Sequence, residues 1–410
     1  MNDYGLTELE NGIRVVHREI THTKVAHIGI MLDIGSRDEL PEEQGIAHFW
    51  EHMAFKGTEK RNSFHIINRL ESVGGELNAY TTKEKICFYA TVLTEHLDRA
   101  LELLVDIVFK STFPEKQIDR ERMVILEEMS MYRDTPEDSI QDDLDEIVFP
   151  EHALGRNILG TEDTVSKFGQ DDFRKFIDRN LNTTKIVVST VGNFKEQQLN
   201  KLVKKYLTEI PYKNHTKDRD CFKPLAAQQK LVKRPISQIH VALGNHAYPI
   251  SDSRRVPLFM LTNILGGPYM NSRLNMSLRE KNGLVYHVEA NYSSYSDTGL
   301  FSIFFATDPR NYKKSVKLVN KELDLLRSAK MSATQLDKAK QQIKGFLAMS
   351  EENNNATMLM MAKSLLDMER IPSLNDVFHQ IEEIEAEQLL EIAQDIFPEE
   401  MNSLIYEPEP

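Results

Sequence analysis

The feature of this sequence that most constrains its fold is an internal repeat. Residues 86–108 read ICFYATVLTEHLDRALELLVDIV, and residues 300–323 read LFSIFFATDPRNYKKSVKLVNKEL. Each stretch is an apolar, β-rich run that enters an amphipathic helix. The elements around the two stretches also follow the same order. The sequence therefore predicts an α+β fold of two homologous domains, each an antiparallel-rich sheet with helices packed on one face.

Hydrophobic periodicity predicts the individual elements of both halves. The first half is predicted to contain strands at 25–32 and within 77–93, with helices near 44–56, 63–73, 95–109 and 114–133. The second half is predicted to contain strands at 239–243, 285–295 and 299–306, with helices near 256–265, 311–329 and 333–350. Residues 214–229 are polar and lack periodicity, which is typical of a linker. The predicted domains are therefore residues 1–213 and 230–410.

Composition and charge exclude several classes of protein. The net charge is −13, and residues 1–220 carry 40 acidic against 29 basic side chains, so nucleic acid is not an expected partner. The acidic first half predicts a preference for basic ligands, with solubility alone as the alternative. The two cysteines, Cys87 and Cys221, are too far apart in sequence for a disulfide framework or a cysteine zinc site.

Membrane and secretory segments are not expected either. No run of eighteen apolar residues occurs, so no membrane partner is predicted. The first residues, MNDYGLTE, contain neither a basic nor an apolar leader. We therefore expect a cytoplasmic protein.

The segment His48-Phe49-Trp50-Glu51-His52 carries candidate metal chemistry. On a helix, His52 lies about 40° from His48 and Glu51 about 60° to the other side, so the three side chains can converge on one ion. Two neutral imidazoles suit zinc, and a carboxylate beside them can accept a proton from water activated by the metal. A surface helix with two histidines is the alternative.

A catalytic zinc needs a third ligand from another element, and the helix near 114–133 offers one. Glu128 is flanked within about 60° by Val124 and Ile125, so its carboxylate is predicted to lie on an apolar stripe, where it needs a partner. Glu121 lies two turns earlier on the same line and is placed to orient a ligand or a water. Glu127 is displaced by about 100° and fits a solvated position.

These motifs together resemble the zinc signature of the pitrilysin family, which includes mitochondrial processing peptidase and insulysin. The matching pattern is His48-x-x-Glu51-His52, with Glu128 76 positions after His52. The resemblance implies one Zn²⁺ per chain, held by His48, His52 and Glu128. It also implies that Glu51 is the general base and that Glu121 has a functional role.

The segment Gly74–Thr81 (GGELNAYT) resembles a second family motif. The resemblance implies an edge strand beside the metal, where a peptide adds as an extra strand along Asn78, Ala79 and Tyr80. An ordinary glycine turn into a strand is the alternative.

In the second half, Leu278–Tyr286 (LREKNGLVY) resembles a third family motif. It implies that Arg279 and Tyr286 hold carbonyl oxygens of the substrate, a task suited to a guanidinium and a phenol. Two surface residues around a turn are the alternative.

The resemblance covers nearly the whole chain and is to the short, two-domain class of the family. It implies a homodimer that encloses a chamber and a zinc metalloendopeptidase that cleaves unfolded peptides or presequences. A non-catalytic structural homologue is an alternative, which the intact zinc set argues against. A zinc hydrolase of a small molecule is another, and a small substrate would not need an edge strand.

Overall fold

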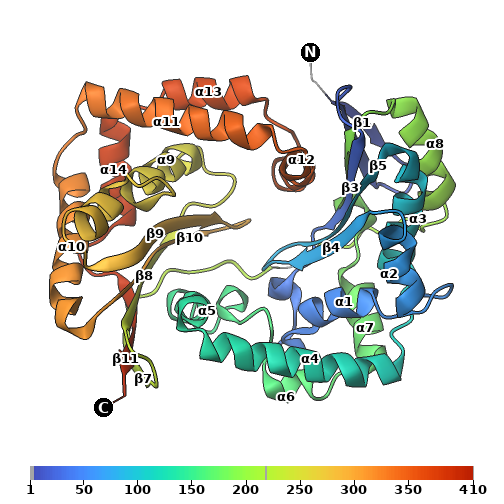
Figure 1. Cartoon of the computed structure of the whole chain (residues 1–410), viewed down its shortest axis with the longest axis horizontal. Coiled ribbons are helices and arrows are strands. Elements are labelled where there is room, and N and C mark those ends of the chain that lie inside the picture. The colour runs from blue at the N-terminus through green and yellow to red at the C-terminus, as the bar shows by residue number, and fades with distance from the viewer. Residues whose placement is uncertain (1–3, 218, 410) are drawn as a thin grey trace. The chain divides into compact units, whose positions relative to one another are not determined.

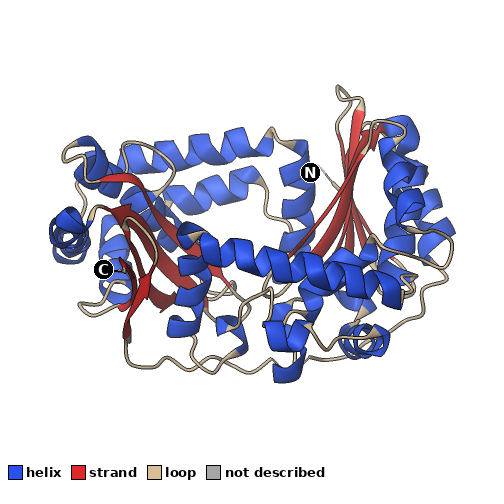
Figure 2. Cartoon of the chain, turned by 60° about the horizontal axis from the view of Figure 1, so that its bottom comes forward, coloured by secondary structure: helices blue, strands red, loops and turns tan. Residues whose placement is uncertain are grey.

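The computed structural model describes residues 4–217 and 219–409, which form two compact units (Figure 1). Unit 1 comprises Met1–Met129, Arg156–Arg219 and Met349–Ile371. Unit 2 comprises Ser130–Gly155, Asp220–Ala348 and Pro372–Pro410. Each unit contains one sheet flanked by helices (Figure 2).

The sheet of unit 1 has six strands in the order β1-β2-β6-β3-β5-β4. Their bounds are β1 Gly5–Glu8, β2 Arg14–Glu19, β6 Ile186–Gly192, β3 Val25–Leu32, β5 Ile86–Leu93 and β4 Glu76–Thr81. Only β2 and β6 pair in parallel; the other neighbours are antiparallel. β4 therefore forms one edge of the sheet.

The five-stranded sheet of unit 2, in the order β7-β11-β8-β10-β9, repeats the topology of β2-β6-β3-β5-β4 and, over the residues that the structure describes, has no counterpart of β1. Its strands are β7 Gln229–Arg234, β11 Asn402–Pro408, β8 Ile239–Ala247, β10 Gly299–Thr307 and β9 Val285–Ser294. β7 and β11 are parallel, as β2 and β6 are, and the other pairs are antiparallel. The predicted α+β fold of two related, antiparallel-rich sheets is confirmed.

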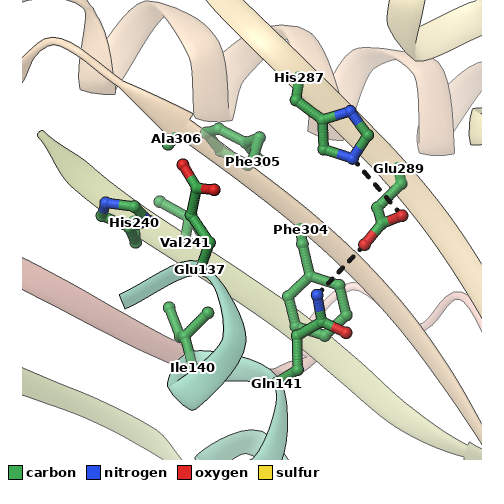
Figure 3. A pocket seen from close by; sticks show the side chains of 10 residues that line it. All are labelled: Glu137, Ile140, Gln141, His240, Val241, His287, Glu289, Phe304, Phe305 and Ala306. Atoms are coloured by element: carbon green, nitrogen blue, oxygen red, sulfur yellow. Dashed lines mark hydrogen bonds and ion pairs between the residues drawn. The ribbon is translucent and has the colours of Figure 1, made fainter. Parts of the chain in front are cut away.

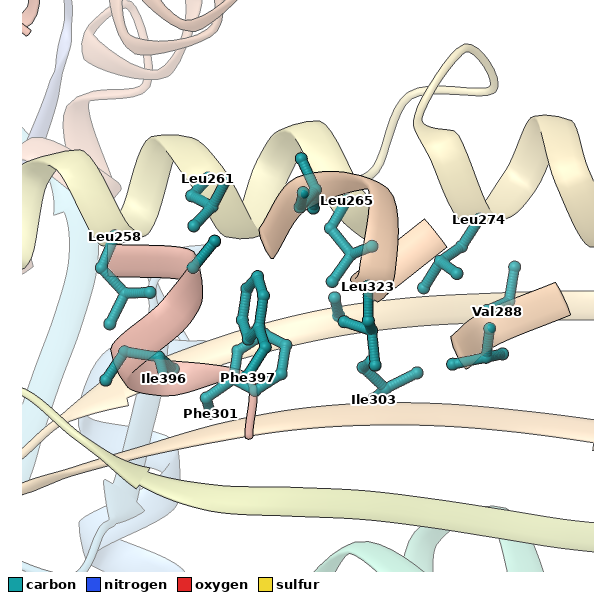
Figure 4. Close-up of a cluster of buried hydrophobic side chains, with 14 of the residues drawn as sticks. Leu258, Leu261, Leu265, Leu274, Val288, Phe301, Ile303, Leu323, Ile396 and Phe397 are labelled. Atoms are coloured by element: carbon teal, nitrogen blue, oxygen red, sulfur yellow. The ribbon is translucent and has the colours of Figure 1, made fainter. Parts of the chain in front are cut away.

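Helices cover one face of each sheet, and this face holds much of the core. Those of unit 1 are α1 Ile46–Ala54, α2 Ser63–Glu71, α3 Leu97–Phe109, most of α4 Glu115–Asp134, α6 Glu162–Val165, α7 Gln170–Asn180 and α8 Glu196–Leu207. Those of unit 2 are α9 Arg255–Gly266, α10 Tyr312–Ser328, most of α11 Ala333–Glu351, α13 Leu374–Glu382 and α14 Ala386–Ile396. Figure 4 shows the unit 2 core, where Leu261 and Leu265 of α9 meet Phe301 and Ile303 of β10.

The opposite face of each sheet is covered by a helix from the other half of the chain. α12 (Asn354–Met368) packs Met358 and Met361 against Met31 and Val187 of the unit 1 sheet. In the same way, α5 (Pro136–Val148) packs its apolar side against β8 and β11 of unit 2. The compact units therefore differ from the contiguous domains 1–213 and 230–410, because two helices are exchanged to cover apolar sheet faces. The predicted linker 214–229 falls almost entirely in 211–228, whose described residues form no helix or strand.

No helix in the described part of the chain is both long and apolar enough to cross a membrane.

Candidate metal centre

α1 is fixed at its start by a buried carboxylate and on one side by aromatic packing. Glu39 accepts hydrogen bonds from the backbone N–H groups of Gly45 and Ala47, both at 2.9 Å, and so satisfies donors at the start of the helix. Gly45 has φ of 93°, and a Cβ there would lie 2.5 Å from a backbone oxygen, so glycine is required. Phe49 and Trp50 are fully buried in the core. The histidines and Glu51 are therefore held on a helix that cannot rotate.

The side chains predicted as ligands converge from α1 and α4. The Nε2 atom of His48 lies 3.8 Å from Oε2 of Glu128, and Nε2 of His52 lies 3.6 Å from the same oxygen. One ligand atom from each of the three residues falls within 4.8 Å of the others, and the described residues contain no second group of this kind. A tetrahedral zinc with bonds of about 2.1 Å separates its ligands by about 3.4 Å, so this spacing fits zinc with little adjustment.

The chemistry of the donors also fits a zinc ion. Burial, followed by the neighbouring His52, lowers the pKa of His48 to about 3, so its imidazole is neutral at physiological pH and available as a ligand. Glu128 supplies the single negative charge, which makes a three-ligand set with one further position available. His48, His52 and Glu128 would therefore hold the metal.

The buried stripe of α4 differs from the one predicted. Ile118, Ile125 and Met129 are buried, whereas Val124 is 49% exposed. Glu128 is half-buried beside the stripe rather than at its centre, because this side of α4 faces the histidines of α1. Glu127 is exposed, as predicted.

Glu121 contacts His52 from the side away from the other ligands. Its Oε2 lies 3.3 Å from Nδ1 of His52, and its Oε1 lies 2.7 Å from Nζ of Lys56. Burial raises the pKa of Glu121, but His52 and Lys56 outweigh that effect, and the pKa is lowered overall. An ionised Glu121 accepts a hydrogen bond from Nδ1–H of His52, which leaves Nε2 of His52 without a proton and directed at the metal position. Lys56 was not predicted, although it lies four positions after His52.

Glu51 lies beside His48, His52 and Glu128 and is hydrogen-bonded to the edge strand. The hydroxyl of Thr81, the last residue of β4, donates to Oε2 of Glu51 at 2.6 Å. Burial raises the pKa of Glu51; Thr81 and His52 lower it in part, and Glu128 raises it further. A carboxylate with a raised pKa is suited to accept and return a proton near neutral pH.

The residues predicted to bind the peptide backbone lie on β4. Asn78, Ala79 and Tyr80 pair with β5 on one side only, since β4 is the edge strand. The side chain of Tyr80 packs near Tyr89, on the sheet face that α12 covers. Ala79 and Thr81 are directed to the opposite face, where α1 lies. The structure therefore gives this strand the free edge that the prediction requires.

Arg279 and Tyr286 belong to unit 2 and form a pair there. Arg279 lies in the last turn of a π-helix, Asn275–Glu280, and its guanidinium lies 5.6 Å from the centre of the Tyr286 ring. Tyr286 is 87% exposed and lies where β9 and β10 shift register, between the pairs Val285–Thr307 and Val288–Phe305. Such a bulge redirects side chains out of the sheet, which accounts for the exposure of Tyr286. Their role in substrate binding stays a prediction.

A pocket of unit 2 lies between α5 and the sheet, close along β9 to Tyr286 (Figure 3). Glu289 lies 3.3 Å from the amide of Gln141 and 3.5 Å from Nε2 of His287. Glu137 and His240 complete its polar lining, over an apolar floor. These groups do not form a metal-binding set among the described residues.

Comparison with known proteins agrees with this geometry. Residues 14–162 match the family model described as Insulinase (Peptidase family M16), and residues 167–343 match Peptidase M16 inactive domain. The uncharacterized zinc protease YmxG of Bacillus subtilis is 33% identical over 400 residues, covering 97% of each chain. The chain belongs to peptidase family M16.

Other M16 relatives and structures extend the match over the full length. An uncharacterized zinc protease of Streptomyces coelicolor is 33% identical over 401 residues, covering 95% of this chain and 86% of that one. The crystal structure of a protease from Helicobacter pylori superposes with a TM-score of 0.90 at 22% identity, covering 99% of each chain. That likeness supports the two-sheet fold of the M16 chain.

Proposed function

We propose that this M16 chain is a zinc metalloendopeptidase that cleaves unfolded peptides or presequences. The observation that carries the proposal is the convergence of His48, His52 and Glu128 beside a glutamate that is hydrogen-bonded to a free sheet edge. Relatives named zinc proteases support the same reaction class. A single ligand group among the described residues supports one zinc per chain.

The residues of unit 1 divide the work of peptide hydrolysis. Zinc, when bound, lowers the pKa of a coordinated water to about 7 and polarises a carbonyl oxygen. Glu51 accepts the proton of the attacking water at its carboxylate and returns it to the nitrogen of the leaving amine. The free edge of β4 hydrogen-bonds the extended backbone of the substrate, which gives affinity with little side-chain selection. Thr81 joins these two tasks, because it ends β4 and holds Glu51.

The proposal extends to the assembly and its location. A cytoplasmic homodimer would enclose the substrate in a chamber, and its size would exclude folded proteins. In this arrangement Arg279 and Tyr286 of one subunit hold carbonyl oxygens of a substrate at the zinc of the other. Their exposure and their pairing in unit 2 support a role in contacting something outside that unit.

The variant Glu51→Gln tests the assignment of the general base. Turnover of a quenched peptide should fall by about 10²–10⁴-fold, because the proton acceptor is lost. Zinc content should stay at one per chain, since Glu51 is not a ligand. Glu127→Gln on the exposed side of α4 makes the same charge change and should keep turnover. A zinc-free Glu51→Gln protein, or one with normal turnover, would contradict the proposal; mass spectrometry of products from a mixed peptide library would give the cleavage preference.

A further inference from the structure

The turn between β4 and β5 carries three consecutive charged side chains that are all buried. Lys83, Glu84 and Lys85 are 5%, 4% and 6% exposed. Charged residues in a hairpin turn normally face water, and burying an ion costs several kcal/mol unless a partner satisfies it. The partners of these three side chains therefore determine where the turn lies.

Glu84 connects the turn to the linker. Its Oε1 lies 2.8 Å from Nη1 of Arg37 and 3.6 Å from Nη1 of Arg219. Arg219 also forms two parallel contacts with Asp38, at 2.8 and 3.0 Å. Such a bidentate pair holds a guanidinium in one orientation. Arg219 is the last residue of its segment in unit 1, and the chain continues from it into unit 2.

Lys85 connects the turn to the exchanged helix α12. Its ammonium forms an ion pair with Asp367, and the two side chains are 8% and 6% exposed. Lys363 also pairs with Asp367, at 2.8 Å. Lys83, the remaining member, donates to the backbone oxygen of Arg156 at 2.6 Å. The turn is thus held by segments from three distant parts of the sequence.

The β4–β5 turn also packs against the loop that precedes α1. The backbone N–H of Arg37 donates to the oxygen of Lys83 at 2.7 Å, and that of Ser36 donates to the oxygen of Thr82 at 3.2 Å. A Cβ at Gly35 would lie 2.4 Å from the oxygen of Lys83, so the two backbones are in direct contact. Thr81, whose hydroxyl holds Glu51, immediately precedes the turn.

We propose that Lys83, Glu84 and Lys85 are positioning residues that keep β4 and the Thr81–Glu51 hydrogen bond in place only while Arg219 of the linker and α12 are packed against the turn. The proposal rests on the proposed peptidase function, in which Glu51 and β4 act on the substrate. The linker and α12 both belong to stretches of chain that continue into unit 2. The turn therefore makes the positions of Glu51 and β4 depend on the linker and on α12.

The variant Lys85→Met tests this in the full-length, zinc-loaded protein. It removes the charge and keeps an apolar stem, while Asp367 retains Lys363 as a partner. Amide hydrogen exchange of the peptide 76–82 should become about tenfold faster, and kcat/KM should fall about tenfold with zinc content unchanged. Asp367→Asn, which leaves the sequence of the turn intact, should have the same effects.

Arg14→Met is the matched control. Arg14 is similarly buried and pairs with Glu369 just beyond α12, but it lies on β2, three strands away from β5. It should leave the exchange of 76–82 at the wild-type rate. Equal acceleration in the control, or no acceleration in both Lys85→Met and Asp367→Asn, would overturn the positioning role. Faster exchange of 76–82 in Lys85→Met and Asp367→Asn, together with a zinc-loaded wild type that cleaves no peptide, would overturn the proposed function and leave the role of the turn intact.

Discussion

Replacing Glu121 with glutamine should weaken zinc binding without removing a ligand. Glu121 is 7% exposed and holds Nδ1 of His52 at 3.3 Å and the ammonium of Lys56 at 2.7 Å. Glutamine has the same size and keeps one acceptor oxygen, but it carries no negative charge. It would orient His52 less firmly and leave Lys56 without its ionic partner here.

The size of the loss follows from the geometry of these contacts. A hydrogen bond to a charged group contributes about 1.5–3 kcal/mol. The contact to His52 is long, and the His52 side chain is 22% exposed, so the lower end applies. A loss of about 1.5 kcal/mol corresponds to a roughly tenfold weaker affinity for zinc. Removing the hydrogen-bond partner of a metal-bound histidine typically weakens metal affinity by about tenfold to a hundredfold, a range that includes this value.

The assay is a competition titration of zinc between the protein and a chromogenic chelator. Glu127→Gln is the control, because it makes the same charge change on the same helix at an exposed position. We expect the control to bind zinc as the wild type does. An unchanged affinity in Glu121→Gln, or an equal loss in both variants, would refute the idea that Glu121 acts through His52.

Three further predictions concern acid stability, the assembly and the substrate. Burial raises the pKa of Asp38, but Lys217 and Arg219 outweigh that effect and lower the pKa in the folded protein. The ionised Asp38 therefore stabilises the fold fully above its unfolded pKa of about 3.9, and this stabilisation is lost as the pH falls through the folded pKa. Asp38→Asn should make the melting temperature depend less on pH in this acid range, and an unchanged dependence would contradict this. Mixing Glu51→Gln with Arg279→Ala subunits should restore about a quarter of wild-type activity if sites are shared across a two-fold dimer, and no recovery after verified exchange would exclude sharing. Cleavage of a Lys/Arg-rich peptide should slow as salt is raised, and an equal response of an acidic peptide would count against steering by the acidic half.

The repeated elements were predictable because each carries its own periodicity. The predicted strand at 25–32 coincides with β3, and the predicted helix at 333–350 ends within one residue of α11. The strands β2 and β6 were not predicted, since their place depends on pairing between residues far apart in sequence. The exchange of α5 and α12 was not predictable either, because an amphipathic pattern shows that a helix has an apolar face but not which sheet that face covers.

The candidate site also contains features that the sequence predicted and features that it did not. Helical geometry was sufficient to predict that His48, Glu51 and His52 lie on one side of a helix, whereas the third ligand, Glu128, was predicted mainly from the family resemblance. The contacts of Lys56 and Thr81 depend on how α1 sits against α4 and β4, and no local pattern encodes that placement. Val124 was misassigned because apolar spacing does not tell which side of a helix meets its neighbour.

The exchange of α5 and α12 has a consequence for how such a chain can be divided. A fragment of residues 1–213 would lack α12 and would present Met31, Cys87 and Val187 to water, while its own α5 would have no sheet to cover. Neither half is then a self-sufficient folding unit, although each carries a complete copy of the repeated topology. Because the two halves belong to one covalent chain, the exchange of α5 and α12 takes place at a fixed local concentration and does not depend on how much protein the cell makes.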